Sequence, residues 1–188
     1  MKKVNELIKL PEVKTIFNLF NNNQGIYLVG GCIRDALSGK DVTDIDFAVD
    51  IDPEEVIKIL TNNNIKFYDI GINYGTVTAV IDSKNYEITS LREDIETDGR
   101  HAKVKYTSDI KADSLRRDFT INAIYANRDG ELFDFHNGIE DIENRKLKFI
   151  GSAIDRVKED YLRILRYFRF YADFSNFEID ANLKKVFK

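Results

Sequence analysis

The apolar positions near the start of the chain recur every three to four residues and then stop at a run of asparagines. They would share one face of a helix: Leu7, Ile8, Val13, Ile16, Phe17 and Phe20. After the asparagines at 21–23, the apolar run 26–29 predicts a strand. Gly30 and Gly31 follow, and a short helical pattern then ends at Gly39. The opening forty residues therefore predict a helix, a strand, a glycine turn and a second helix.

The middle of the chain alternates between strand and helix patterns. Residues 45–49 form a second predicted strand, and Asp52 with Pro53 supplies an N-cap and a first-turn proline for a helix to about residue 60. The further strand patterns are separated by turn residues: 76–81, 86–91 and a hairpin over 124–135. Helices interspersed with hairpins predict an α+β fold, with a mixed β-sheet flanked by helices.

The last forty residues lose the strand pattern and predict one helix from about Asp155 to Tyr171. At about 100° per residue, the polar side of this helix carries Asp160 and three arginines: Arg163, Arg166 and Arg169. We expect the apolar side to pack against the rest of the chain: Tyr161, Ile164, Leu165, Phe168 and Tyr171. The change of character predicts a domain boundary near Gly151, between residues 1–150 and residues 151–188.

Composition narrows the class of protein. The chain has 188 residues and a net charge of −4. It contains no apolar run of the ~20 residues that a membrane helix needs, and its first residues do not resemble a signal peptide. We therefore expect a cytoplasmic protein without a membrane partner. Cys32 is the sole cysteine, which excludes an intramolecular disulfide and a cysteine-based zinc site. Basic residues are concentrated in the segment 156–169, so any contact with nucleic acid should be local.

Two aspartates lie at the second predicted strand. Because side chains alternate along a strand, Asp44 and Asp46 should share one face while Ile45 and Phe47 point into the core. Two carboxylates about 6–7 Å apart along the backbone can share hard divalent cations. This arrangement suits two-metal phosphoryl transfer, which needs ions at both the attacking hydroxyl and the leaving pyrophosphate. A solvated aspartate pair in an ordinary loop is the alternative interpretation.

The glycine turn ahead of these aspartates offers the complementary half of such a site. Gly30 and Gly31 leave backbone N–H groups open to phosphate oxygens where a helix begins. Arg34, one turn into that helix, can add a charge-assisted fork to the same triphosphate. By itself a Gly-Gly turn is most often plain loop structure. In combination with the aspartates it indicates a nucleoside triphosphate site.

Together the glycine turn and the aspartates resemble the signature of the polymerase-beta nucleotidyltransferase superfamily. The segment 30–35 ahead of Asp44 and Asp46 is similar to the version in CCA-adding enzymes and bacterial poly(A) polymerases. Later segments resemble further motifs of that family in the same order: 91–102, 116–123 and 159–163. The resemblance implies a polymerase-beta-like nucleotidyltransferase head over residues 1–150, followed by the start of an all-helical neck.

The resemblance also implies roles for residues of the head. Arg117 and Asp118, which we expect where a helix begins after a cap at Asp113 or Ser114, would contact ribose and phosphate. Glu87 is the candidate for a third catalytic carboxylate on an adjacent strand. Without the resemblance, the arginines at 116–117 would be interpreted as a surface ion-pair cluster.

For base recognition the resemblance points to the last predicted helix. Asp160 and Arg163 would bind the Watson–Crick edge of the incoming base, in place of a nucleic-acid template. A carboxylate accepts from the amino group that cytosine and adenine share, and a guanidinium donates to ring acceptors. Arg166 and Arg169 would contact phosphate or the RNA backbone. A solvated basic face with one Asp–Arg pair is the alternative.

The activity that the resemblance implies is addition of C and A, from CTP and ATP, to a tRNA 3′ end with Mg²⁺ as cofactor. The alternatives are ATP-only addition, by an A-adding enzyme or a poly(A) polymerase, and a head that binds nucleotide or RNA without full activity. Residues 97–102, with His101, resemble a flexible loop that CC-adding relatives lack, which favours CCA or A addition. Family members continue into helical regions that bind the tRNA acceptor stem, and we expect these to lie outside the 188 residues. The sequence predicts no oligomeric state.

Overall fold

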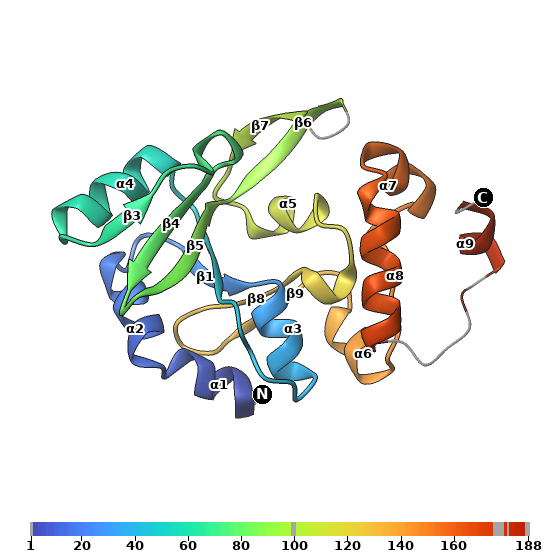
Figure 1. The fold of residues 1–188 in the computed structure, drawn as a ribbon, viewed down its shortest axis with the longest axis horizontal. Coiled ribbons are helices and arrows are strands. Elements are labelled where there is room, and N and C mark those ends of the chain that lie inside the picture. Colours follow the sequence, from blue (N-terminus) through green and yellow to red (C-terminus); the bar gives the residue numbers. More distant parts are fainter. Residues whose placement is uncertain (1, 99–100, 175–178, 180, 187–188) are drawn as a thin grey trace.

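The computed structural model describes residues 2–98, 101–174, 179 and 181–186 (Figure 1). The helices, with two short 3-10 turns labelled η, are α1 (Lys2–Ile8), α2 (Pro11–Leu19), α3 (Gly31–Leu37), α4 (Pro53–Asn62), η1 (Ile72–Tyr74), α5 (Ile110–Leu115), η2 (Thr120–Asn122), α6 (Gly138–Glu143), α7 (Ala153–Glu159), α8 (Leu162–Phe174) and α9 (Ala181–Val186). The strands are β1 (Ile26–Val29), β2 (Asp46–Val49), β3 (Lys66–Tyr68), β4 (Thr76–Ile81), β5 (Lys84–Ser90), β6 (Arg92–Asp98), β7 (His101–Tyr106), β8 (Ile124–Ala126) and β9 (Leu132–Asp134).

Seven of these strands form one mixed sheet in the order β3-β4-β5-β2-β1-β8-β9. β2 and β5 run parallel, whereas the other neighbours in this sheet pair antiparallel. β6 and β7 form a separate two-stranded ribbon. The predicted α+β class and the mixed sheet flanked by helices are confirmed. Figure 1 places α8 and α9 at the opposite end of the long axis from α4 and β3.

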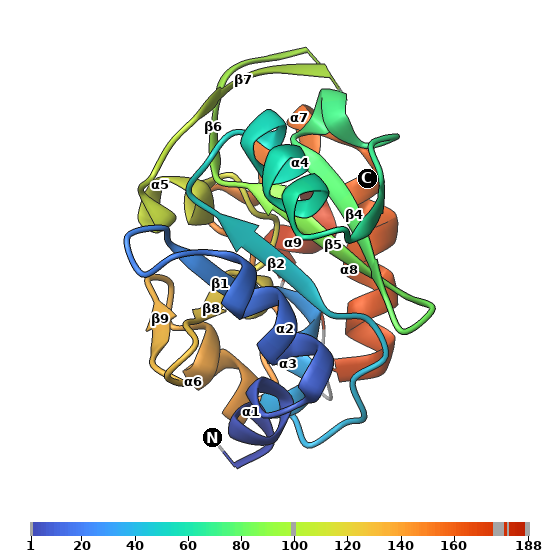
Figure 2. The ribbon, with the colours of Figure 1, turned by 90° about the vertical axis from the view of Figure 1, so that its left-hand side faces the viewer.

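The two faces of the sheet are covered unequally. Leu28 of β1 and Phe47 of β2 belong to the main core, which is packed under the helices α1 to α4. α4 packs against β3, β4 and β5, and Figure 2 shows α2 and α4 on the side of the molecule nearest the viewer. The opposite face carries a small second cluster: Val29, Ala48, Leu91 and Tyr125. Because side chains alternate along a strand, Asp46 and Ala48 share this second face.

The N-terminal helical pattern is divided into two helices, not one. Pro11 is the first residue of α2, and the chain turns at Lys9 and Leu10 between α1 and α2. Proline has no N–H to donate and so suits a first helical position, while it interrupts a helix that precedes it. The apolar periodicity nevertheless continues across the break, and Val4, Leu7, Val13 and Ile16 all reach the same core.

The segment that resembles a flexible loop forms the β6–β7 ribbon. His101, expected in a mobile loop, begins β7 and pairs with Asp98. The main chain on both sides of the tip forms a ladder with one irregularity between Asp94 and Glu96, so His101 lies in a strand and not in a loop. Gly99 and Arg100 lie outside the described residues. β3, which has no clear strand pattern, is a further addition to the predicted elements.

The single helix predicted over 155–171 is wrong, because the chain breaks at Asp160. This residue has extended backbone angles (φ −153°, ψ 107°) between α7 and α8. Its carboxylate accepts from the N–H of Leu162 at 2.9 Å, and its carbonyl accepts from the N–H of Arg163 at 3.0 Å. Aspartate is a favoured N-cap, so the side chain satisfies the start of a new helix and ends the old one.

The face of α8 that packs also differs from the prediction. Tyr161 and Leu165 are 70% and 67% exposed, whereas Tyr167 and Phe170 are 2% and 8% exposed. Tyr167 stacks on Phe149 with centroids 5.6 Å apart, and Phe170 packs edge-on against Phe119 at 5.6 Å. The aromatic residues that precede α7, Phe119 and Phe149, therefore determine which face of α8 is buried. The domain boundary near Gly151 stays a prediction.

Candidate active site

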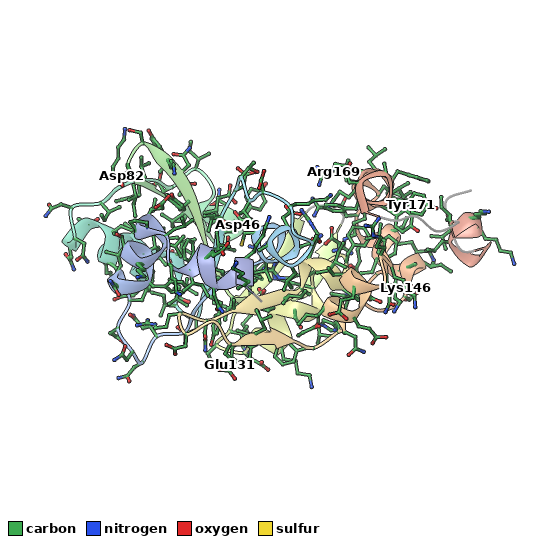
Figure 3. The ribbon with its side chains drawn as sticks, turned by 90° about the horizontal axis from the view of Figure 1, so that it is seen from below. Asp46, Asp82, Glu131, Lys146, Arg169 and Tyr171 are labelled. Carbon is green, nitrogen blue, oxygen red and sulfur yellow. The ribbon has the colours of Figure 1, made fainter. Side chains whose placement is uncertain are left out.

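A cavity of about 410 Å³ lies where the β1–α3 turn, the start of β2, the segment after α5 and the helix α8 meet. Its lining is strongly polar: Gly30, Gly31, Arg34, Asp35, Thr43, Asp44, Asp46, Arg117, Asp118, Asn122, Arg166, Arg169, Phe170 and Asp173. Figure 3 shows Asp46 near the middle of the molecule and Arg169 farther along, on α8. Most residues singled out in the sequence thus come together from four separate segments.

Gly30 makes the turn from β1 into α3 at the edge of this cavity. Its φ of 76° and ψ of −127° suit glycine, since a residue with a side chain rarely adopts a positive φ. A Cβ at this position would lie 3.6 Å from Nη1 of Arg117. Gly31 then begins α3. The turn therefore keeps the cavity wall at this point free of side chains, as predicted.

Arg34 is held rigidly before any ligand arrives. Its Nε and Nη2 donate to the two oxygens of Asp35 at 2.9 Å each, and its Nη1 donates to Oδ1 of Asn122 at 2.7 Å. The guanidinium also lies 4.8 Å from the centroid of the Phe170 ring. Asn122 and Phe170 were not singled out in the sequence, although Asn122 lies inside the motif segment 116–123.

The acidic side of the cavity is formed by Asp44 and Asp46, with Glu87 beside them. β2 begins at Asp46, so Asp44 precedes the strand and is exposed, with Thr43 Oγ1 donating to its carboxylate at 3.1 Å. Glu87 of β5 pairs in register with Asp46. Burial, the nearby charge of Glu87 and that of Asp44 raise the pKa of Asp46 to about 6, against the opposing effect of Arg117.

These carboxylates fit a divalent cation by the chemistry of their donors. Hard oxygen ligands are those that Mg²⁺ prefers. The pKa of Asp46 is raised first by burial and then by the charges of Glu87 and Asp44, and a bound cation would offset both the buried charge and the repulsion. Within the described ranges, however, no group of three histidine, cysteine or acidic side chains is already drawn together around one point. The ligands would have to converge when an ion binds.

Arg117 and Asp118 follow a helix and do not begin one. α5 is capped by Asp109, whose carboxylate accepts from the N–H of Lys111 at 2.8 Å, and it ends before Arg116. The prediction of a cap at Asp113 or Ser114 is therefore wrong, because both residues lie inside α5. Their side chains turn inward, and both are fully buried.

Asp118 connects the head to α8 across the cavity. Its Oδ1 accepts from the N–H of Phe119 at 2.9 Å and from Nδ2 of Asn122 at 3.2 Å. Its Oδ2 accepts from Nε of Arg166 at 2.7 Å. Arg166 and Arg169 flank the ring of Phe170, with centroid distances of 5.6 and 4.7 Å. Two of the three arginines predicted on one helix side therefore face the cavity.

Asp160 and Arg163 lie outside the cavity lining. Arg163 Nη1 donates to Oε2 of Glu159 at 2.6 Å and to the carbonyl of Arg156 at 3.0 Å. Its Nη2 donates to the carbonyl of Arg116 at 3.4 Å. Side-chain bonds from Arg156 and Arg163 hold Glu159 ionised and lower its pKa, although burial alone would raise it. The structure thus places this pair at the α7–α8 junction, next to the cavity residues of α8.

Residues 26–148 match the family model described as the poly A polymerase head domain. The mitochondrial CCA tRNA nucleotidyltransferase 1 of Danio rerio is 47% identical over 174 residues, which cover 87% of this chain and 40% of that protein. Among the residues that the structure describes, no helix has the length and apolar character needed to cross a membrane.

Solved structures give the same comparison in three dimensions. The chain resembles a Bacillus stearothermophilus CCA-adding enzyme in complex with CTP, with a TM-score of 0.79 and 30% identity over 94% of this chain and 42% of that one. It also resembles a tRNA nucleotidyltransferase bound to a primer tRNA and an ATP analogue, with a TM-score of 0.67, 26% identity, and coverage of 97% and 48%. The chain spans about 40% of the length of the curated relatives that it matches.

Proposed function

Because this chain belongs to the poly A polymerase head domain family, we propose that it is the catalytic head of a tRNA nucleotidyltransferase that adds C and A to a tRNA 3′ end. The observation that carries the proposal is one cavity that holds the paired aspartates on one side and arginines on the other. Such a cavity matches a nucleoside triphosphate, whose phosphates need cationic partners and whose reaction needs metal ligands. CTP, ATP and the tRNA end are the proposed substrates.

Asp44 and Asp46, with Glu87 as the third carboxylate, are the proposed metal-site residues, and Mg²⁺ is the proposed ion. When bound there, the ion would favour the attacking 3′-hydroxylate and offset the charge of the leaving pyrophosphate. The parallel register of β2 and β5 keeps Asp46 beside Glu87, and Asp44 is free to move toward them because it precedes the strand. Asp46 and Glu87 would therefore be ligands in fixed positions, and Asp44 would be a ligand that adjusts its position.

The remaining cavity residues are proposed to bind the nucleotide. Gly30 and Gly31 would admit phosphate oxygens close to the main chain, while Arg34 and Arg117 would face the triphosphate. Asp118 and Asn122 sit next to Arg34 and Arg117, within reach of ribose hydroxyls. Such groups are oriented before the ligand arrives, which lowers the entropy lost on binding.

Asp160 and Arg163 are proposed to select the base, and Arg166 and Arg169 to bind phosphate or RNA. For Arg163 this role requires a rearrangement, because its guanidinium is bonded to Glu159 and to two main-chain carbonyls. The bond from Arg156 Nη1 to Glu159 remains when Arg163 leaves, so Glu159 keeps one arginine partner. The change therefore exchanges one set of hydrogen bonds for another.

ATP-only addition, by an A-adding enzyme or a poly(A) polymerase, is the second candidate. The matching family model, which is described as a poly A polymerase head domain, favours retaining this candidate. A head that only binds nucleotide would have no need of the aspartate pair. For location, the cytoplasm stays our expectation for an enzyme that meets tRNA, although the Danio rerio relative is named as mitochondrial.

The test is incorporation of each labelled NTP into tRNA that ends before CCA, before CA or before A, with Asp44→Ala as the inactive variant. Asp41→Ala is the matched control, since it is an exposed aspartate three residues away and outside the cavity lining. We expect C, C and A in turn from the chain and from the control. Binding of CTP is measured separately from the rise in melting temperature, which follows RT ln(1 + [L]/Kd). Addition of A alone would favour the second candidate, and equal activity of Asp44→Ala would contradict the metal assignment.

A further inference from the structure

Asp113 is a fully buried carboxylate outside the cavity lining that binds the arginines of the Arg-Arg-Asp segment. Its Oδ1 accepts from Arg116 Nε at 2.8 Å and Nη2 at 2.6 Å, and its Oδ2 accepts from Arg117 Nη2 at 3.1 Å. Burial alone would raise the pKa of Asp113, but Arg117 and Arg116 hold it at about 2. The carboxylate is therefore ionised throughout the working pH range and pulls both guanidinium groups inward.

Tyr125 of β8 completes the arrangement around Arg117. Its hydroxyl donates to Oδ2 of Asp113 at 2.6 Å and accepts from Nε of Arg117 at 2.9 Å. Its ring lies under the guanidinium, with 5.1 Å between Cζ and the ring centroid. The tyrosine is fully buried, so its hydroxyl has these protein partners in place of water.

These contacts leave one end of Arg117 for the cavity. Nε and Nη2 are engaged by Asp113 and Tyr125. Nη1 donates one N–H to the carbonyl of Asn122 at 3.5 Å and lies beside Gly30 with its second N–H. An arginine side chain loses considerable rotamer freedom when it is fixed. Here that loss accompanies folding, and it is not repeated when a ligand binds.

We propose that Asp113 and Tyr125 are positioning residues that fix Arg117 with Nη1 directed at the β- and γ-phosphates of the incoming nucleotide. This inference rests on the proposed function, since it requires that the cavity take a nucleoside triphosphate. It adds that Tyr125, a core residue on the far side of Arg117 from the cavity, controls triphosphate affinity through Arg117 and by no other route.

The experiment is a double-mutant cycle between Tyr125→Phe and Arg117→Ala, read out as the Kd for CTP with Mg²⁺ and, in parallel, for CMP. Tyr125→Phe retains the ring and removes only the hydroxyl, whereas Asp113→Ala would leave two inward-facing guanidinium groups without their carboxylate and endanger folding. Tyr27→Phe is the matched control, because Tyr27 packs edge-on against Tyr125 at 6.3 Å and lies outside the cavity lining.

We expect Tyr125→Phe to weaken CTP binding about tenfold in the parent chain, as the loss of a hydrogen bond to a charged group does. In the Arg117→Ala background the same substitution should change Kd less than about twofold, because the residue through which it acts is gone. CMP, which lacks the outer phosphates, should bind almost equally in all variants, and Tyr27→Phe should match the parent.

Each other outcome overturns the inference in a recognisable way. An equal loss in both backgrounds would mean that Tyr125 acts through packing, and an unchanged Kd in the parent background would mean that Arg117 needs no support. If the parent chain itself fails to bind CTP, the nucleotide site is absent. The proposed function then fails together with the inference, and not the inference alone.

Discussion

Replacing Asp46 with asparagine should stabilise the metal-free protein while removing its activity. Asp46 is ionised at neutral pH only against burial and the repulsion of Glu87 and Asp44, which raise its pKa to about 6. Asparagine has nearly the same shape and carries no charge. The substitution therefore removes the unfavourable charge and keeps the packing at the start of β2.

The magnitude follows from the two pKa values. The interval from the ordinary 3.8 to about 6, at 1.36 kcal/mol per pKa unit, gives about 3 kcal/mol as an upper limit. Partial solvent exposure reduces this, so we expect a gain of about 1–3 kcal/mol at pH 7.5. In the folded state the pKa is raised, so the penalty is absent at low pH and grows as pH rises from about 4 to about 6. By pH 4.5 the gain should fall to about 1 kcal/mol or less.

The assay is urea unfolding of the parent and of Asp46→Asn at pH 7.5 and pH 4.5, without divalent ions and then with Mg²⁺. With Mg²⁺ at ten times its Kd the parent should gain about 1.4 kcal/mol, whereas the variant should gain much less. The variant should also fail to extend tRNA. A variant that is less stable than the parent at pH 7.5, or a gain that does not depend on pH, would refute the reasoning about charge at this site.

Two further predictions concern packing and base choice. Gly138→Ala should lower the free energy of unfolding by about 2–3 kcal/mol in urea, because its Cβ would lie 2.3 Å from the carbonyl oxygen of Thr120; a loss under about 0.5 kcal/mol would show that the chain relaxes there. In competition among the four NTPs, Asp160→Ala should accept UTP or GTP more readily by about 5- to 150-fold, whereas Arg169→Ala should weaken binding without changing preference. Unaltered preference in Asp160→Ala would remove the base-reading assignment.

Much of the sheet could be predicted because its strands are dense in β-branched and aromatic residues. The run 26–29 and the segment 76–81 coincide with β1 and β4, and the hairpin over 124–135 forms β8 and β9. The ribbon of β6 and β7 could not be predicted in the same way. β6 is charged at most positions and shows no apolar alternation, so the weak alternation of Ala102, Val104 and Tyr106 in β7 has no matching strand pattern beside it. Main-chain pairing between the two strands is what defines the ribbon.

For the candidate site, the sequence identified most residues that line the cavity, but it did not identify the side chains to which they are hydrogen-bonded. Gly30, Asp46 and Arg117 were identified by motif and lie together in the cavity. Asn122 was hidden within a motif segment, and its importance appears only when its side chain bonds to Arg34 and Asp118. The contact with Arg34 joins positions 88 residues apart, and periodicity reports only on neighbours along one element.

The break at Asp160 gives this position a property that a residue within a continuous helix would lack. One carboxylate oxygen, Oδ1, holds the first turn of α8 through Leu162, and the second oxygen has no part in that cap. Asp160→Asn can therefore keep the cap with its amide oxygen while presenting an N–H₂ group where the aspartate presents an acceptor. The hydrogen-bonding polarity of this position can therefore be inverted, from an acceptor that suits amino groups to a donor that suits carbonyl groups, without unwinding the helix on which it stands.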